Sequence, residues 1–219
     1  MALSRNTLSE IPKDAVELSP EEAVMYQWKI IGNWEKSSEV WALNYAPEIL
    51  GVCGTFTGIY MNNYFRGKLK LGQYGKLSTY LPIVVLPAIT TLIYHKFFIQ
   101  KELLLEPFQC PTCLQLRAAA FQTCLGVIYP SLLAPIASFM FATRHYTFRL
   151  PSVTEKPMEV VALLRKMTKP IVPTIGAVIS FHALLAMYIT FKETQQYINV
   201  QKKMVQLEAD IIANNEIEL

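Results

Sequence analysis

Residues 77–94 read LSTYLPIVVLPAITTLIY and contain no charged side chain. A helix needs about 20 mostly apolar residues to cross a hydrocarbon core of about 30 Å, and this run comes close without interruption. Three other stretches are similarly apolar, so the predicted spans are residues 48–65, 77–99, 117–142 and 170–191. Buried core helices of a soluble domain are rarely this long. The sequence therefore predicts an all-α, multi-pass membrane protein with four transmembrane helices.

The composition agrees with a membrane protein and with a single domain. Of the 219 residues, 52% are hydrophobic and 17% are charged, whereas soluble domains usually carry about 25% charge. We expect an N-terminal polar segment and amphipathic helix in residues 1–44, the transmembrane domain in residues 45–191, and a helical tail in residues 192–219. The net charge is only +3, and the basic residues form no patch of the kind that binds nucleic acid, so a nucleic-acid partner is not expected.

Both flanking segments carry helical signals. Ser19-Pro20-Glu21-Glu22 is typical of a helix start, with Ser19 as the cap and Glu22 closing a capping box. Trp28 follows, and an aromatic residue there suits either a membrane interface or packing on protein. In the tail, apolar residues recur every three or four positions, namely Tyr197, Val200, Met204, Leu207 and Ile211. Two heptads are short for an independent coiled coil, so this seam is predicted to pack on a partner or on the N-terminal helix.

Small residues and prolines mark the predicted spans. Gly51, Gly54 and Gly58 lie in the first span, and such a spacing allows a neighbouring backbone to approach closely. Prolines recur in the other spans, as in Pro82 and Pro87, and favour kinked packing helices over the broken helices of a transporter, because ionisable residues are nearly absent.

His182 is the only ionisable side chain at mid-span, and we expect a hydrogen-bonded packing role for it. His95, near the end of the second span, is expected to reach toward the membrane surface.

The loop charges predict an orientation. Residues 66–76 and 143–169 are rich in Lys and Arg, whereas residues 100–116 are mixed. The positive-inside rule then places the first and third loops on one face, and both termini and the loop 100–116 on the other. In an inner mitochondrial membrane, the basic face would be the matrix side. The acid-rich first 40 residues do not resemble a mitochondrial presequence, so any such targeting is expected to reside in the spans.

Cys110 and Cys113 form a C-x-x-C motif in the predicted loop 100–116. A zinc site needs four ligands, and no second motif of this kind is present. A thioredoxin-like site belongs to a βαβ context that is missing here. A local disulfide or an inert thiol pair remains. If the membrane is mitochondrial, the loop is predicted to lie on its more oxidising side, which makes a disulfide a reasonable hypothesis.

Motifs for catalysis are absent from the sequence. It contains no phosphate-binding glycine loop, no nucleophile elbow and no H-E-x-x-H, and its three histidines are dispersed at positions 95, 145 and 182. We therefore expect a protein that is not an enzyme and needs no metal or cofactor.

Several short strings occur together in a recognisable order. They are NNYFR at 62–66, LP at 81–82 and 86–87, CPTC at 110–113, GVIYP at 126–130, ATRHY at 142–146 and TKP at 168–170. In this order, over about residues 45–190, the chain resembles the transmembrane protein 126 family, which has paralogues A and B in vertebrates. The C-x-x-C looks more like paralogue A, while the N-terminal 40 residues and the tail match neither closely.

The resemblance implies an inner-membrane protein of mitochondria that assists assembly of the membrane arm of respiratory complex I. Its partners would be membrane-arm subunits, other assembly factors and inner-membrane lipids. The expected interaction surface combines the glycine face, Gly51, Gly54 and Gly58, with the basic residues Arg144, Arg149, Arg165, Lys166 and Lys169. A permanent accessory subunit of a respiratory complex and a small-solute carrier or channel are the alternatives.

Overall fold

The computed structural model describes residues 17–106, 110–151 and 156–217, and these residues form helices joined by short connections. The first 16 residues of the predicted N-terminal segment lie outside the described part. In chain order the helices are α1 (Pro20–Gly32), α2 (Ser37–Lys68), α3 (Lys76–Tyr80), α4 (Leu86–Tyr94), α5 (Lys101–Leu105), α6 (Pro111–Thr123), α7 (Tyr129–His145), α8 (Pro157–Thr168) and α9 (Val172–Ile217). The π-helical segments η1 (Leu81–Val85), η2 (His95–Gln100) and η3 (Cys124–Ile128) and the 3₁₀ turn η4 (Lys169–Ile171) connect successive helices without a break.

Three continuous helical stretches are long and apolar enough to cross a membrane. Counting α2 as the first rod of the bundle, they are the second rod (Lys76–Leu105), the third rod (Pro111–His145) and the fourth rod (Pro157–Ile211). They contain the predicted spans 77–99, 117–142 and 170–191. The predicted first span, residues 48–65, lies inside α2, which does not meet the same standard of apolarity. Three glycines and the polar residues Thr55, Thr57, Asn62 and Asn63 lower its mean hydropathy. The structure thus supports three of the four predicted spans by length and composition.

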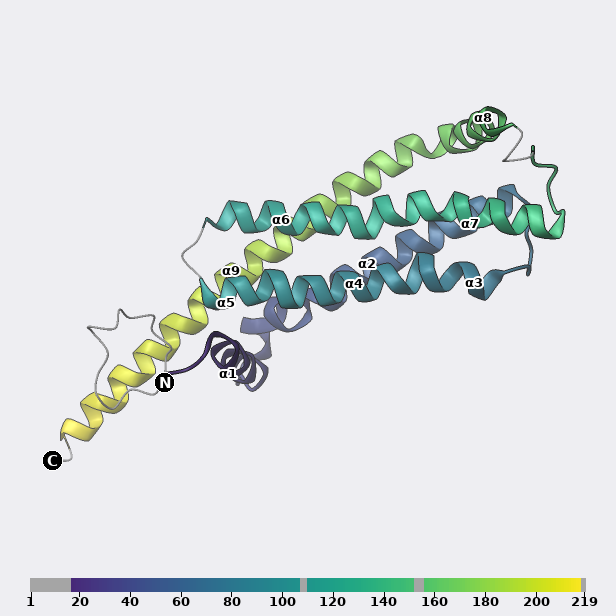
Figure 1. Cartoon of the computed structure of the whole chain (residues 1–219). Helices are drawn as coiled ribbons and strands as arrows, with labels where there is room; N and C mark the ends of the chain where they lie inside the picture. Colours follow the sequence, from purple (N-terminus) through teal and green to yellow (C-terminus); the bar gives the residue numbers. More distant parts are fainter. Residues whose placement is uncertain (1–16, 107–109, 152–155, 218–219) are drawn as a thin grey trace.

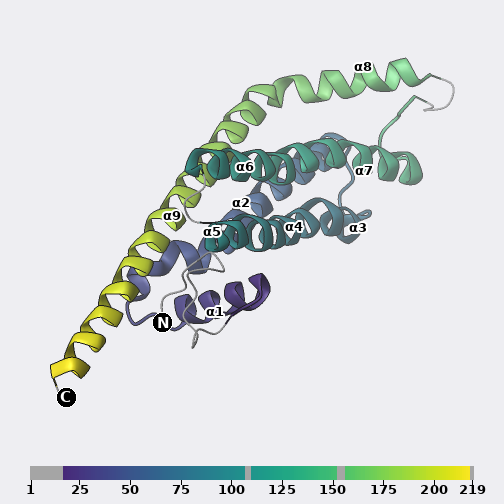
Figure 2. The same ribbon diagram turned by 60° about the vertical axis from the view of Figure 1, so that its left-hand side comes forward.

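The long helices run side by side, and α2 is the central one (Figures 1 and 2). It packs against α4, α7 and α9 and against η1 and η3. The connection from α2 to α3, the end of α7 and the start of α8 lie at one end of the bundle. The end of α5, the start of α6, α1 and the C-terminal part of α9 lie at the other (Figure 1). We call these the α8 end and the α1 end.

The predicted loop 143–169 needs a correction, because most of its second half is helix α8. Both α8 and α1 lie across the bundle. Figure 1 views them nearly along their axes, while α4, α6 and α7 are seen from the side. After the rotation in Figure 2, both short helices appear lengthwise. Each end of the bundle therefore carries one crosswise helix.

Helix α1 begins as predicted and packs on protein. The Ser19 side chain accepts a hydrogen bond from the Glu22 backbone, and the Glu22 side chain accepts one from the Ser19 backbone. The Ser19 hydroxyl also donates to the Glu22 carboxylate, and this bond, together with the one from the Ser19 N–H, lowers the pKa of the Glu22 carboxyl group. Val24 and Ile31 pack with Leu103 and Leu104, and with Tyr197 and Val200 of α9. The tail seam therefore packs on the N-terminal helix, although Leu207 and Ile211 farther along it are exposed.

The three glycines of α2 allow close contact with the neighbouring rods. A Cβ atom on Gly58 would lie 2.6 Å from the Ile83 carbonyl oxygen, and one on Gly51 would lie 3.3 Å from the Ala88 oxygen. Pro87 has no N–H group with which to bond the Ile83 carbonyl four residues before it. A Cβ on Gly54 would lie 3.6 Å from the Cα of Gly126. The glycines of α2 thus leave room for the backbone of the facing rod, in which Pro87 leaves one carbonyl oxygen without its usual helical hydrogen bond.

The glycines of the expected interaction surface lie inside the bundle. Gly51, Gly54 and Gly58 are all buried against η1, α4 and η3 of the same chain. Their small size serves packing within the bundle, so the glycine face is not open to a partner in this structure.

We predict that Gly58→Ala destabilises the bundle. Its new methyl group would overlap a backbone oxygen that cannot move independently of its helix, and overpacking of this kind costs about 1–3 kcal/mol. Thermal unfolding of the purified protein in detergent measures the effect as a lower Tm. Gly67→Ala is the matched control, because it makes the same change in α2 where nothing lies within 4 Å. Equal Tm values for the two variants would contradict the packing argument.

Candidate functional site

The outer surface of the bundle is apolar at mid-length. On α2 the side chain of Phe56 is 67% exposed. Large exposed apolar residues on the other rods include Ile89, Ile93, Leu132, Ile136, Phe181 and Leu184. A surface of this kind suits lipid tails or the helices of another membrane protein. Among the polar side chains buried in the described bundle, three clusters each touch α2.

The first cluster lies toward the α1 end and contains a carboxylate. His95 Nε2 lies 2.9 Å from Glu193 Oε2, and the Gln100 amide nitrogen donates to Glu193 Oε1 over 2.8 Å. Glu193 is 0% exposed and His95 is 3% exposed. The cluster joins α9 to the π-helical segment η2 of the second rod. Contrary to the expectation for His95, this side chain points into the bundle and does not reach the membrane surface.

The same cluster satisfies the backbone of α2 near a proline. Pro47 lies within α2 and has no N–H group for the Leu43 carbonyl. The Gln100 amide nitrogen donates to this carbonyl oxygen over 2.8 Å. Gln196 of α9 accepts a hydrogen bond of 2.9 Å from the Ala42 N–H. Side chains from two other rods therefore hold α2 where a proline interrupts its own hydrogen bonds.

Sequence reasoning missed Glu193 because it ended the last span at residue 191. The tail seam does continue upstream, however, at the same three- and four-residue steps. Val200, Tyr197, Glu193, Ile189, Ala186 and His182 are all buried along α9. Extending the seam toward the N-terminus would have placed Glu193 on the buried side of the helix, and a buried carboxylate requires a partner.

The second cluster surrounds His182. The Thr57 hydroxyl oxygen lies 2.9 Å from Nε2, and the Gln122 amide nitrogen lies 3.0 Å from Nδ1. That amide nitrogen also donates to the Leu50 carbonyl oxygen over 3.1 Å. Because an amide nitrogen only donates, Nδ1 must accept, and a neutral imidazole then donates from Nε2 to Thr57. Both ring nitrogens are thus engaged in holding α2, the third rod and α9 together, which agrees with the packing role expected for His182.

The third cluster holds the connection at the α8 end. Arg66 donates to the Gly72 carbonyl over 2.7 Å, to the Tyr74 carbonyl over 3.0 Å and to the Thr79 hydroxyl over 3.0 Å. Asn62 also donates to Thr79. The Arg66 side chain is buried, so it orders the turn between α2 and α3 and is not a surface charge of the loop.

The predicted basic residues are exposed at the α8 end. Arg144 lies in the last turn of α7, Arg149 follows this helix, and Arg165 and Lys166 lie in the last turn of α8 with Lys169 just beyond. All five are exposed. They are available to solvent, to head groups or to another protein.

The structure pairs Cys110 and Cys113 in a disulfide with a Cα–Cα distance of 5.3 Å. Cys110 is the N-terminal cap of α6, and its sulfur accepts a hydrogen bond from the Cys113 N–H. Both residues are exposed.

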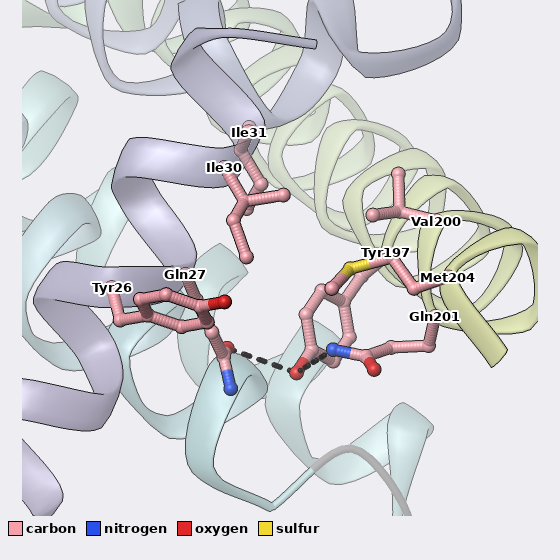
Figure 3. A pocket seen from close by; sticks show the side chains of 8 residues that line it. All are labelled: Tyr26, Gln27, Ile30, Ile31, Tyr197, Val200, Gln201 and Met204. Atoms are coloured by element: carbon pink, nitrogen blue, oxygen red, sulfur yellow. Dashed lines mark hydrogen bonds between the residues drawn. The ribbon is translucent and has the colours of Figure 1, made fainter. Parts of the chain in front are cut away.

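Two small cavities lie among the described residues. One lies between α1 and α9, where Tyr26, Ile30 and Met204 line it beside the hydrogen-bonded Gln27, Tyr197 and Gln201 (Figure 3). Its volume is about 10 Å³, about the space needed for one water molecule. Another, beside Cys110, has about 40 Å³. Neither is large enough for a metabolite.

We predict that Glu193→Ala lowers the stability of the protein by about 2–5 kcal/mol, because it leaves His95 and Gln100 buried without their acceptor and each unsatisfied buried group costs about 1–3 kcal/mol. Glu193→Gln, which keeps one acceptor oxygen, should fall between this variant and the native protein. Thermal unfolding in detergent measures both. Asp210→Ala removes an exposed carboxylate from the same helix and should leave the Tm within about one degree, since exposed substitutions usually change stability by less than about 0.5 kcal/mol. A native Tm for Glu193→Ala would overturn the role assigned to this cluster.

Comparisons with known proteins identify the family of this chain. The family model described as Transmembrane protein 126 matches residues 27–207. A Drosophila melanogaster protein named Transmembrane protein 126 is 52% identical over 212 residues, which cover 96% of this chain and 95% of that protein. Proteins named Complex I assembly factor TMEM126B, mitochondrial, are more distant. The mouse protein is 31% identical over 47% of this chain and 44% of its own length, and the human protein is 30% identical over 49% and 46%. No solved structure matches. The chain belongs to the Transmembrane protein 126 family.

Proposed function

We propose that this protein is a scaffold of the mitochondrial inner membrane that binds incomplete sub-assemblies of the complex I membrane arm. The observation that carries the proposal is its membership of a family whose mouse and human relatives are named mitochondrial complex I assembly factors. The structure is compatible with a binding role. Its polar groups are largely used within the bundle, while its outer surface offers large apolar side chains.

The proposal includes α2 as a fourth span within a membrane domain of residues 45–191. With 32 residues at 1.5 Å each, α2 is about 48 Å long, more than a bilayer core requires. Thr57, Asn62 and Arg66 lower its apolar character, but all three are buried against other rods. The side of α2 that faces outward carries Val52 and Phe56. Four passes also fit the position of α1 and the end of α9 at one end of the bundle (Figure 1).

The basic α8 end is proposed to face the matrix, with the α1 end and the Cys110–Cys113 segment facing the intermembrane space. Arg144, Arg149, Arg165, Lys166 and Lys169 supply the positive charge that such a topology requires. Arg66 contributes less than the sequence suggested, because it is buried.

Transport receives no comparable support. A carrier needs polar groups that are free to bind a solute at mid-membrane. His182, the one ionisable side chain expected there, is hydrogen-bonded through both ring nitrogens to other rods. The described cavities have room for about a water molecule or slightly more. Because the interior is occupied by contacts between rods, we infer that the protein acts by packing its outer surface against other membrane proteins.

Complexome profiling tests the proposal. Mitochondrial membranes are solubilised in mild detergent and separated on a native gel, and each slice is analysed by mass spectrometry. We expect this chain to comigrate with partial assemblies of complex I and to be depleted from the mature enzyme. Comigration with the mature enzyme alone would instead identify a permanent accessory subunit, and migration apart from any respiratory complex would refute both roles.

A paired set of variants locates the contact. We expect an Arg144→Gln, Arg149→Gln variant to lose comigration with the partial assemblies while remaining in the membrane, because these exposed side chains form part of the proposed contact. Lys68→Gln with Lys70→Gln removes the same charge from exposed residues at the same end and should leave comigration intact. Equal behaviour of the two variants would exclude a specific role for Arg144 and Arg149.

We also propose that the Cys110–Cys113 disulfide is present in cells, in keeping with the oxidising side assigned to that segment. Intact mitochondria are treated with a thiol-alkylating mass tag before and after reduction. The native chain should gain two more tags after reduction than a Cys110→Ser, Cys113→Ser variant gains. An equal gain in the two proteins would show that the pair is reduced.

A further inference from the structure

Helix α8 is the first part of the rod Pro157–Ile211, yet its axis turns away from the direction of α9. The 3₁₀ turn Lys169–Ile171 separates it from α9, and α8 lies across the bundle while the spans run along it (Figures 1 and 2). If the spans follow the membrane normal, α8 lies in the plane of the membrane. Helix α8 begins only about a dozen residues before the apolar span 170–191. This short separation places α8 at the depth of the lipid head groups.

Only one part of α8 is held by protein. Leu164 and Met167 pack against the cluster that contains Met61 and Phe65, and the Tyr64 hydroxyl donates to the Met167 carbonyl oxygen over 2.9 Å. No residue of the helix is buried. Toward its N-terminus the side chains of Met158 and Val161 are 78% and 57% exposed. The bundle thus fixes the C-terminal half of α8, while apolar side chains of its N-terminal half remain exposed.

The sequence of α8 is amphipathic. At 100° per residue, Val160, Leu163, Leu164 and Met167 fall on one side of the helix, with Val161 at its edge. Arg165 falls on the opposite side, while Glu159 and Lys166 lie at the flank next to Leu163. A short helix with an apolar side and a cationic side, next to a span, has the character of a helix that lies in the membrane interface.

The charges of this segment are complementary to an anionic surface. Lys156 and Glu159 form an ion pair of 3.0 Å and offset each other. Arg165, Lys166 and Lys169 are exposed and have no such acid beside them in α8. These three residues lie where α8 meets α9, so their positive charge lies next to the head groups of that leaflet.

We propose that α8 lies in the head-group region at the α8 end of the bundle and binds anionic phospholipid, with Val160, Val161 and Leu163 inserted and with Arg165, Lys166 and Lys169 on the phosphates. The proposal deepens the membrane arrangement described under the proposed function, because it requires the rod that contains α9 to span the bilayer. It does not require complex I to be the partner.

Hydrogen exchange of the full-length protein in nanodiscs tests the proposal. Discs of phosphatidylcholine alone are compared with discs that also contain phosphatidylglycerol, and exchange of the amides of residues 157–168 is followed by mass spectrometry. Each basic residue near an anionic surface favours binding by about fivefold. We expect exchange in α8 to slow at least about fivefold in the anionic discs, while α1 at the opposite end is unchanged.

Two variants and a control variant separate lipid binding from other causes of slow exchange in α8. Replacement of Arg165, Lys166 and Lys169 by Gln should abolish the difference between the two kinds of disc, and Val161→Ser should reduce it. Lys68→Gln with Lys70→Gln, at the same end, should preserve it. The Tm of each variant in detergent shows whether the bundle remains folded, which is expected because all the replaced residues are exposed.

Several results would overturn the proposal. Exchange that is equal in both kinds of disc would show that α8 does not sense anionic lipid. Protection that persists in the triple Gln variant would show that α8 is held by the bundle alone, and protection that appears only when soluble matrix proteins are added would identify a protein partner. None of these results depends on the complexome experiment, so the two proposals succeed or fail separately.

Discussion

The close contact between α2 and the second rod is the constraint on which the rest of the bundle depends. Gly58 meets the carbonyl oxygen of Ile83 with no room for a methyl group between them, and Pro87 prevents the usual helical bond to that carbonyl. Where lipid surrounds a helix, association relies on packing and on hydrogen bonds between helices, because the hydrophobic effect no longer distinguishes protein from solvent. A backbone that is brought this close to its neighbour fixes the position of every side chain along α2.

The polar residues of α2 then have defined partners. Thr57 meets His182, the Leu43 carbonyl meets Gln100, and Arg66 closes the turn that follows. In an apolar environment an unsatisfied polar group costs several kcal/mol, so each of these pairs also specifies which rods are neighbours. The π-helical segments η1, η2 and η3 lie along the faces where these contacts occur, as is common where a helix accommodates an irregular contact.

The sequence was sufficient for the parts of the fold that depend on local composition. Uninterrupted apolar runs such as residues 77–94 identified three rods, and the capping box at Ser19 identified the start of α1. It was insufficient where a contact joins distant residues. Glu193 and His95 are 98 positions apart, and nothing local shows that they meet. A glycine spacing shows that something approaches closely, but it cannot say whether that neighbour belongs to the same chain. Helix α8 was missed because its short apolar side does not resemble a span.

The burial of the glycine face changes what a partner can recognise. Small residues are the usual means by which membrane helices from different chains associate closely, and here they are used between α2 and its own neighbours. What remains outside are large, exposed side chains such as Phe56, Ile89 and Phe181, together with the crosswise helices at the two ends. Contacts between large side chains are broader and less closely packed than a glycine-lined helix interface, and they separate more readily. A surface of that kind fits the proposed role of holding an incomplete complex and later leaving it, because in that role the contact must be strong enough to form but must also give way when the permanent subunits arrive.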